Sequence, residues 1–279
     1  MLITKYLNAE ARFTGTVRYF PVAGASVIEN YRSPDFYVFL LFEKCSGIHT
    51  VDFIDYQQKD LQLHISFPGQ IHSWNSGSDT IGHKLLVSKS LIETSLFVTQ
   101  FAHLKSNGYP VIDISHEVFN HLVREFSAIG HELGLPTPSW DVIHLRTQLV
   151  TAITNRLLEE VTDVTSIQKI THPVLVKFQF LVEEYFREMR SVAEYAEKLF
   201  VSANYLSALC RKFKGVPPKK IIDQRIILET KRLLYGTDMS IKDLANNLGF
   251  PDPASFSNFF KSNTGMYPKK YKNGGSSLK

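Results

Sequence analysis

At 279 residues, with 44% hydrophobic and 21% charged side chains, the chain has the length and composition of a globular protein of two domains. Its two cysteines argue against a disulfide framework and a thiolate zinc site, and no stretch approaches the roughly 20 apolar residues that cross a bilayer. The net charge of +4 is unevenly divided, since residues 1–170 hold 13 basic and 17 acidic side chains and residues 171–279 hold 18 and 10. The sequence therefore predicts a cytoplasmic protein that contacts nucleic acid with its basic rear half.

Short β-strands are predicted in the first hundred residues. Runs rich in β-branched and aromatic residues, separated by turn residues, occupy segments 36–44, 47–58, 61–69 and 83–88. Several short strands at this spacing are typical of an antiparallel sandwich or barrel.

Three helices are predicted next, because apolar residues recur at helical spacing in segments 90–104, 117–134 and 139–161. The third carries an apolar stripe of Val142, Leu145, Leu149, Ile153, Leu157 and Val161. This stripe fits packing on its own barrel, a dimer contact with a second subunit, or both. The polar segment from Thr162 to Pro173 is expected to link two domains, residues 1–165 and 166–279.

The rear domain carries one pattern twice, within about 190–215 and about 239–265. Four residues recur 49 places later, Ser191, Val192, Ala196 and Leu199 as Ser240, Ile241, Ala245 and Leu248. Four more recur 50 places later, Leu206, Leu209, Gly215 and Pro218 as Phe256, Phe259, Gly265 and Pro268. Duplicated units of this size on a basic segment predict two helix-turn-helix motifs that grip successive major-groove faces of DNA.

Local signals mark where these helices begin. Ser191 with Glu194 three residues later forms a capping-box pattern, and Ser240 with Asp243 approximates it. Asp252 before a proline predicts another helix start. Segment 217–236 is expected to form one helix that connects the two units.

The recognition helices are predicted from Ser202 to Lys212 and from Pro253 to Ser262. A helix of this kind lies in the major groove, roughly 12 Å wide, and presents side chains to base edges. Its outward residues are the DNA-contact candidates: Ser202, Ala203, Asn204, Ser207, Ala208, Arg211, Lys212, Ala254, Ser255, Ser257, Asn258 and Lys261. Each alone also fits a solvated helix face, whereas duplication and positive charge favour DNA binding for the set.

The segment SIKDLANNLGFPDPASFSNFFKSNTGMYPKKY resembles the signature of the AraC/XylS family of bacterial transcription regulators. The positions that match the signature are Phe250, Phe256, Phe260, Lys261, Gly265 and Pro268, and the resemblance extends over about 175–272. The signature differs at Asn258, where arginine is common, and at Lys272, which replaces an arginine and is expected to contact phosphate. Ala208 and Cys210 also depart from the family's usual residues, so base preference cannot be carried over.

The resemblance implies an α+β protein. Its N-terminal part would be a cupin-like β-barrel with dimerisation helices, and its C-terminal part an all-α domain with two helix-turn-helix motifs reading adjacent turns of double-stranded DNA, about 34 Å apart. It further implies a homodimer, a contact with RNA polymerase, activation of transcription and a small-molecule effector, often a sugar.

The effector-pocket candidates are His72, Trp74 and His83, with His49 and His64 as weaker neighbours. An aromatic ring beside hydrogen-bonding imidazoles suits a sugar, whose apolar face stacks while its hydroxyls need partners. These residues also fit ordinary strand positions, and the front half would then only dimerise or bind a partner protein.

The alternative of a cupin enzyme requires two histidines one residue apart, a carboxylate and a further histidine around a metal. The chain lacks that pair, and it also lacks a nucleophile elbow, a phosphate-binding glycine loop and an H-E-x-x-H helix. No catalytic residue, metal or cofactor is therefore predicted.

Overall fold

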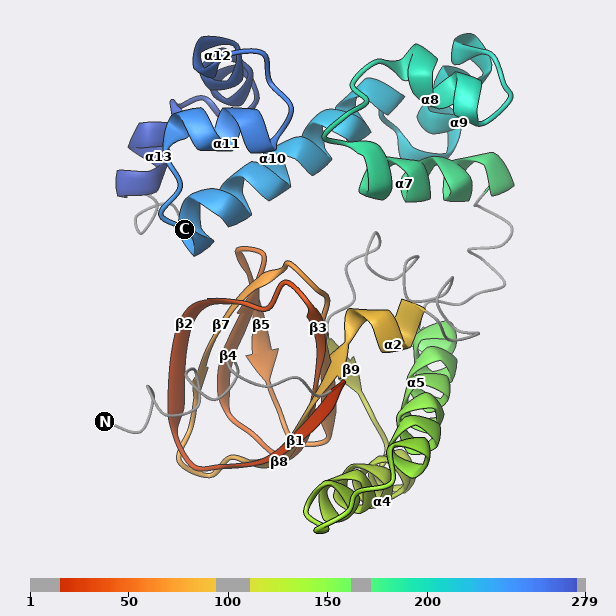
Figure 1. Cartoon of the computed structure of the whole chain (residues 1–279), viewed down its shortest axis with the longest axis vertical. Helices are drawn as coiled ribbons and strands as arrows, with labels where there is room; N and C mark the ends of the chain where they lie inside the picture. The colour runs from red at the N-terminus through yellow and green to blue at the C-terminus, as the bar shows by residue number, and fades with distance from the viewer. Residues whose placement is uncertain (1–15, 94–110, 162–171, 275–279) are drawn as a thin grey trace. The chain divides into compact units, whose positions relative to one another are not determined.

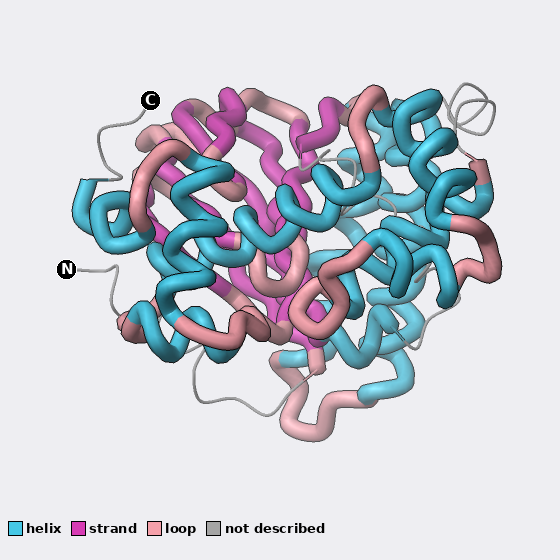
Figure 2. Tube along the Cα trace, turned by 90° about the horizontal axis from the view of Figure 1, so that it is seen from above, coloured by secondary structure: helices cyan, strands magenta, loops and turns pink. Residues whose placement is uncertain are grey.

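The computed structural model describes residues 16–93, 111–161 and 172–274. The chain divides into two compact units, Met1–Asp163 and Val164–Lys279. The first contains two sheets and flanking helices, whereas the described part of the second contains only helices and loops (Figure 1, Figure 2). The predicted α+β class, with a β-rich domain before an all-α domain, is confirmed.

Two antiparallel sheets build the first unit, here called the β domain. One has the strand order β1-β8-β3-β6-β9 and the other β2-β7-β4-β5. The elements are β1 (Val17–Ala23), β2 (Ser26–Arg32), β3 (Phe36–Lys44), β4 (Gly47–Val51), β5 (Ile54–Gln58), β6 (Gln62–Ser66), β7 (Ile71–Ser76), β8 (Ile81–Ser88), α2 (Lys89–Glu93), β9 (Val111–Asp113), α4 (His116–Leu133) and α5 (Trp140–Val161).

The five-stranded sheet packs on different partners through its two faces, because side chains alternate along each strand. Leu85 of β8 belongs to the apolar cluster that contains Phe126 of α4 and Val150 of α5. Its neighbour Leu86, on the opposite face, packs with Trp74 of the second sheet. One face is therefore covered by α4 and α5, and the other faces the second sheet (Figure 1).

The strands agree with the sequence where the apolar pattern is strong. Segments 36–44, 61–69 and 83–88 each contain a strand, and segment 47–58 is two strands divided at Asp52 and Phe53, which both have positive φ. The sequence does not predict β1, β2, β7 or β9, because polar residues interrupt the pattern or the strand is short. Of the predicted helix 90–104, residues 94–104 lie outside the described residues, as does most of the predicted linker.

Helix α5 buries one face in its own domain and exposes another. The buried face holds Ile143, Val150, Leu157 and Leu158. Val142, Leu145 and Leu149 are exposed instead, and Leu145 keeps 66% of its surface in contact with solvent. The predicted stripe is therefore divided, with its first half on the exposed face and Leu157 in the core.

The second unit, here called the helical domain, consists of short helices around one longer helix. They are α7 (Pro173–Tyr185), α8 (Val192–Lys198), α9 (Ala203–Lys214), α10 (Pro218–Gly236), α11 (Ile241–Asn247), α12 (Pro253–Thr264) and α13 (Pro268–Gly274). One apolar cluster includes Leu206 and Cys210 of α9, Ile226 of α10 and Phe256 of α12. Both helix-turn-helix units thus share a continuous core with α10.

The predicted helix starts are confirmed in atomic detail. Ser191 Oγ accepts a hydrogen bond from the Glu194 amide, and Glu194 Oε2 accepts one from the Ser191 amide at 2.8 Å, which completes the capping box. Ser240 caps α11, and Asp252 accepts from the Ser255 amide at 2.7 Å to cap α12. No helix in the described part of the chain is long and apolar enough to span a bilayer.

Candidate nucleic-acid interface and ligand cavity

Helices α9 and α12 are built alike. Each has 12 residues, a side-chain cap at its first turn and a left-handed glycine at its end, Gly215 or Gly265. A short helix precedes each of them, α8 before α9 and α11 before α12. In Figure 1 α8 and α9 lie near one end of α10, and α11 and α12 lie near its other end. The domain thus presents two helix-turn-helix units joined by one longer helix.

The two helices expose most of the residues that the sequence predicts. The exposed candidates are Ser202, Asn204, Ala208, Arg211, Lys212, Ala254, Ser255, Asn258, Lys261 and Lys272, whereas Ala203, Ser207 and Ser257 are half-buried. Leu206, rather than Tyr205, packs inward, and Tyr205 is exposed. The outward faces of α9 and α12 are therefore mainly polar, and each carries an exposed basic side chain.

Several of these serines already bond to their own helix. Ser202 Oγ accepts from the Tyr205 amide, Ser255 Oγ donates to Asp252, and Ser257 Oγ donates to the Pro253 carbonyl at 2.7 Å. A hydroxyl used in this way is less available to a base edge. The residues with long exposed donors are Asn204, Arg211, Lys212, Asn258 and Lys261.

The basic residues follow the repeat. Arg211 and Lys261 occupy equivalent positions 50 residues apart, and both are exposed. The Lys261 ammonium lies 4.4 Å from the centroid of the Tyr267 ring and donates to its hydroxyl at 3.3 Å, which holds the charge at the end of α12. Lys272 Nζ donates to the Thr237 carbonyl at 3.3 Å, so this predicted phosphate contact also supports the end of α10.

A second pair of basic segments, not among the predicted DNA contacts, follows the same repeat. Pro-Lys-Lys occurs at 218–220 and again at 268–270, at the first turns of α10 and α13, and all four lysines are exposed. The signal was available, because it continues the 50-residue repeat past Gly215 and Gly265.

A buried ion-pair network fastens α7 to α10. Glu229, 2% exposed, accepts from Arg187 at 3.2 Å, Arg225 at 3.1 Å and Arg232 at 3.5 Å. Arg225 Nε also donates to both carboxylate oxygens of Glu183 on α7, at 2.9 Å each. Charges this deeply buried require partners with good geometry, so the network constrains how the two helices cross.

The chain that leads into α8 also contacts the second helix-turn-helix unit. The Arg190 guanidinium donates to the Leu248 carbonyl and lies 3.5 Å from the centroid of the Phe250 ring. Gly249, between them, has φ +71°, and a Cβ there would lie 2.0 Å from the Arg187 carbonyl oxygen. The turn of the second unit is therefore held against the start of the first, independently of α10.

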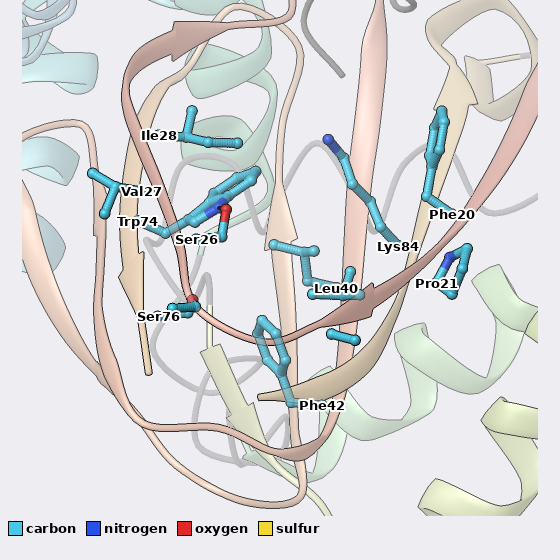
Figure 3. A pocket seen from close by; sticks show the side chains of 13 residues that line it. Phe20, Pro21, Ser26, Val27, Ile28, Leu40, Phe42, Trp74, Ser76 and Lys84 are labelled. Carbon is cyan, nitrogen blue, oxygen red and sulfur yellow. Dashed lines mark hydrogen bonds between the residues drawn. The ribbon is translucent and has the colours of Figure 1, made fainter. Parts of the chain in front are cut away.

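The β domain contains a cavity of about 350 Å³ between its sheets (Figure 3). Its lining is mainly hydrocarbon and includes Phe20, Ile28, Leu40, Phe42, Trp74 and Lys84. The strand register brings these side chains together. Phe20 of β1 and Leu40 of β3 both pair with Lys84 of β8, one from each neighbouring strand, and Ile28 of β2 pairs with Trp74 of β7.

The three predicted pocket residues are divided among three environments. Trp74 lines the cavity. His72 is not part of the lining and lies beside Trp74, with the two ring centroids 5.0 Å apart. His83 points to the helix-covered face, where its Nδ1 is 2.8 Å from the Tyr19 hydroxyl. His83 and the cavity-lining Lys84 are successive residues of one strand and so face opposite sides.

The weaker candidates, His49 and His64, join His72 inside the domain. The Nδ1 atoms of His49 and His64 are 2.9 Å apart, and the rings of His49 and His72 are 5.8 Å apart. Burial lowers the pKa of His49 to about 4 and lowers the pKa of His64 and His72 well below the ordinary value of 6.5. All three are therefore neutral near pH 7, and neither ring nitrogen of His72 has a partner among the described residues.

No group of three or more His, Cys, Asp or Glu side chains in the described ranges is arranged to hold a metal ion. The Nδ1 atoms of His49 and His64 lie at hydrogen-bond distance from each other.

Two helix-turn-helix units joined by α10, with polar and basic faces outward, define a double helix-turn-helix domain of the DNA-binding class. A family model described as a helix-turn-helix domain matches residues 195–274. The match covers most of the region in which the sequence resembles the AraC/XylS family.

Similar proteins share this part of the chain. The HTH-type transcriptional regulator YijO of Escherichia coli is 28% identical over 91 residues, 33% of this chain and 32% of YijO. RafR, the raffinose operon transcriptional regulatory protein of Pediococcus pentosaceus, is 23% identical over 153 residues, 54% of this chain and 55% of RafR. The solved structure of ToxT from Vibrio cholerae is 16% identical, with 92% of this chain and 97% of that chain covered and a TM-score of 0.43.

The matches thus span about a third of YijO and about half of RafR. Both relatives are named as transcription regulators, which agrees with the prediction that the chain is not an enzyme.

Proposed function

We propose that this protein is a sequence-specific DNA-binding transcription regulator that reads two adjacent major-groove faces with α9 and α12. The observation that carries the proposal is the repeated exposed polar face on the two helix-turn-helix units that α10 joins. A pair held by a common core and by Arg190 binds DNA as one rigid reader rather than as two independent ones.

Base readout in this proposal depends on Asn204 and Asn258, whose side chains are exposed on α9 and α12. An asparagine amide matches the N6 and N7 edge of adenine in the major groove. Arg211 and Lys212 read guanine or hold phosphate, and Lys261, Lys272 and the lysines of the Pro-Lys-Lys repeat hold phosphate. The half-buried Ala203, Ser207 and Ser257 then shape the surface rather than donate to bases.

The regulator acts as a homodimer through α5. Val142, Leu145 and Leu149 form an exposed apolar row on a helix whose opposite face already packs in its own domain. Apolar residues at this spacing on an exposed face are typical of a helix that pairs with a second copy. Two copies would place four recognition helices on paired DNA sites.

The β domain senses a small molecule and shifts the population of DNA-binding arrangements. Its cavity of about 350 Å³ is within the usual range for ligand sites, roughly 300–1,000 Å³. A sugar is the ligand class expected from the sequence, and one relative is named for the raffinose operon. Activation of transcription in the cytoplasm, with a contact to RNA polymerase, completes the proposed role.

The experiment is a DNA-binding titration of the full chain at several salt concentrations, with pooled random-sequence duplexes followed by selection. The expected result is a selected sequence bound roughly 10³-fold or more tightly than the pool, with affinity falling steeply as salt rises. Binding that shows neither a salt dependence nor a sequence preference would contradict the proposal.

A further inference from the structure

Helices α9 and α12 each expose a row of three side chains. In α9 the row consists of Asn204, Ala208 and Arg211, which are all exposed. Their spacing of four and then three residues places them on one side of the helix. The other side holds Leu206 and Leu209, which are buried in the core of the helical domain. The row is therefore the part of α9 that a DNA duplex can reach.

In α12 the same positions of the 50-residue repeat hold Ala254, Asn258 and Lys261, and these are exposed as well. Phe256 and Phe260 are buried on the other side of the helix. Both rows thus contain an asparagine, an alanine and a basic residue. The asparagine comes first in α9 and second in α12, so the two amides stand at positions that are not equivalent.

The exposed residues beside the asparagine of α9 and the alanine of α12 have hydroxyl groups that are already bonded within the domain. The Tyr205 hydroxyl lies 3.2 Å from His172 Nε2. At the equivalent position of α12, Ser255 Oγ donates to Asp252 Oδ2 at 2.6 Å. A hydroxyl bonded in this way is less available to a base edge. Base readout therefore depends on the asparagines and alanines of the two rows.

Asparagine and alanine recognise different bases in the major groove. An asparagine amide donates to N7 of adenine and accepts from its N6 amino group, whereas the methyl group of alanine packs against the C5-methyl group of thymine. Residues four apart on a helix are separated by about 6 Å along its axis, so the two side chains of one row reach different base pairs. The order of the two residues along a helix therefore specifies the order of the two bases.

We propose that α9 and α12 read adenine and thymine in opposite orders. In the base pairs that α9 contacts, its half-site, Asn204 pairs with an adenine and Ala208 packs against a thymine methyl group. In the half-site of α12, Ala254 packs against a thymine methyl group and Asn258 pairs with an adenine. Ala208 and Ala254 are then specificity-determining residues. The inference rests on the proposed function, and it predicts that one chain binds two half-sites of different sequence.

The first test uses the duplex that the full chain selects from random sequences. Each thymine in turn is replaced by deoxyuridine, which lacks the C5-methyl group and keeps the base pair. One such replacement in each half-site should lower the affinity about 4-fold, the effect of leaving one apolar carbon group without its contact.

Variants assign each methyl contact to a helix. Ala208→Gly should abolish the methyl effect in one half-site, and Ala254→Gly should abolish it in the other. Each variant is compared with itself on the thymine and deoxyuridine duplexes, so a general loss of helix stability cancels. The matched control is Ala203→Gly, at a half-buried alanine of α9 outside the row, which should leave both methyl effects unchanged.

The second test exchanges the order of the two residues in one helix. Asn204→Ala combined with Ala208→Asn gives α9 the order that α12 has. Selection with this double variant should move the adenine preference to the other position of the α9 half-site, with a change of about 10-fold or more at each position and none in the α12 half-site. Asn247→Ala, at an exposed asparagine of α11, should leave the base preferences of both half-sites unchanged.

The outcomes separate this inference from the proposed function. A selected site without a methyl-sensitive thymine, methyl effects that persist in both glycine variants, or an exchange variant that keeps the original base order would overturn the inference and leave a sequence-specific regulator standing. Binding without any sequence preference would overturn both. If the exchange variant binds no DNA, the deoxyuridine comparisons with the single variants still decide the question.

Discussion

The two domains bury polar groups in opposite ways. In the helical domain, Glu229 is surrounded by arginines that match its charge. In the β domain, the interior holds His49, His64 and His72 in neutral form beside a cavity, and His72 has no partner for its ring nitrogens within the described structure.

This difference suggests that the helical domain is the more rigid of the two and the β domain the more adaptable. Paired buried charges allow few alternative packings, which suits helices that must stay a fixed distance apart on DNA. An interior that combines a cavity with an imidazole that has no hydrogen-bond partner is less tightly constrained, which suits a domain that responds to a ligand.

Removing the central charge of the helical domain should have the largest effect. Glu229→Gln removes the negative charge that Arg187, Arg225 and Arg232 share and should lower the free energy of unfolding of this domain by about 3–5 kcal/mol. Urea unfolding followed by far-UV circular dichroism measures the loss. The matched control is Glu197→Gln, at an exposed residue of α8, which should change stability by less than about 0.5 kcal/mol. Similar losses in both variants would contradict the rigid-module interpretation.

The β domain should instead lose stability in acid. Its buried histidines have lowered pKa values, about 4 for His49, so below about pH 6.5 the unfolded chain takes up protons that the folded chain does not. Stability is full above about pH 6.5 and falls by about 1.4 kcal/mol per pH unit for each such histidine as pH decreases toward 4.

Fluorescence of Trp74 and Trp140, both in the β domain, measures this loss during urea unfolding. His72→Phe should reduce the loss of unfolding free energy per pH unit by the amount that one buried histidine contributes. The matched control is His121→Phe, at an exposed position of α4. An unchanged slope in His72→Phe would show that the buried cluster does not control the acid response.

The turns of the two helix-turn-helix units should respond with opposite signs. Gly249→Ala introduces a Cβ at φ +71° and 2.0 Å from the Arg187 carbonyl, and should destabilise the domain by more than about 1 kcal/mol. The equivalent residue of the first unit is Phe200, which has φ +57° and is 95% exposed. Phe200→Gly relieves the left-handed backbone and should change stability by less than about 1 kcal/mol, in the stabilising direction. Thermal unfolding compares the two, and equal signs would show that the turns are equivalent.

Substitutions at Asn258 and Lys261 should affect DNA binding in different ways. Asn258→Ala should cost about 1–3 kcal/mol at one base position of a selected site and little elsewhere. Lys261→Met should weaken binding to all sequences and lower the salt slope by about one. Competition with single-base variants of the site distinguishes them, and a uniform loss in Asn258→Ala would remove its assignment to base readout.

The helical domain could be predicted closely from the sequence because its signals are local. Ser191 with Glu194, Asp252 before Pro253 and the terminal glycines each lie within a few residues of the helix end that they determine. The 49- to 50-residue repeat predicts the two helix-turn-helix units without information on which residues contact one another. The Arg190 contact with Phe250 could not be predicted in the same way, because 60 residues separate the partners.

The β-domain cavity was much less predictable. Lys84 lies beside Phe20 and Trp74 only because strand pairing brings β1, β7 and β8 together, and no local signal reports that pairing. Strands β2 and β7 contain many polar residues, so their sequences lack the apolar alternation that predicts a strand. A shift of one residue along β8 separates Lys84, inside the cavity, from His83, on the helix-covered face.

A hydroxyl-radical footprint of the full chain on its selected DNA site tests most directly whether α9 and α12 read DNA together. Two protected segments are expected on one face of the duplex, separated by about 10–10.5 base pairs, with Asn204→Ala weakening one and Asn258→Ala weakening the other. A single protected segment, or loss of the same segment in both variants, would contradict two rigidly spaced recognition helices.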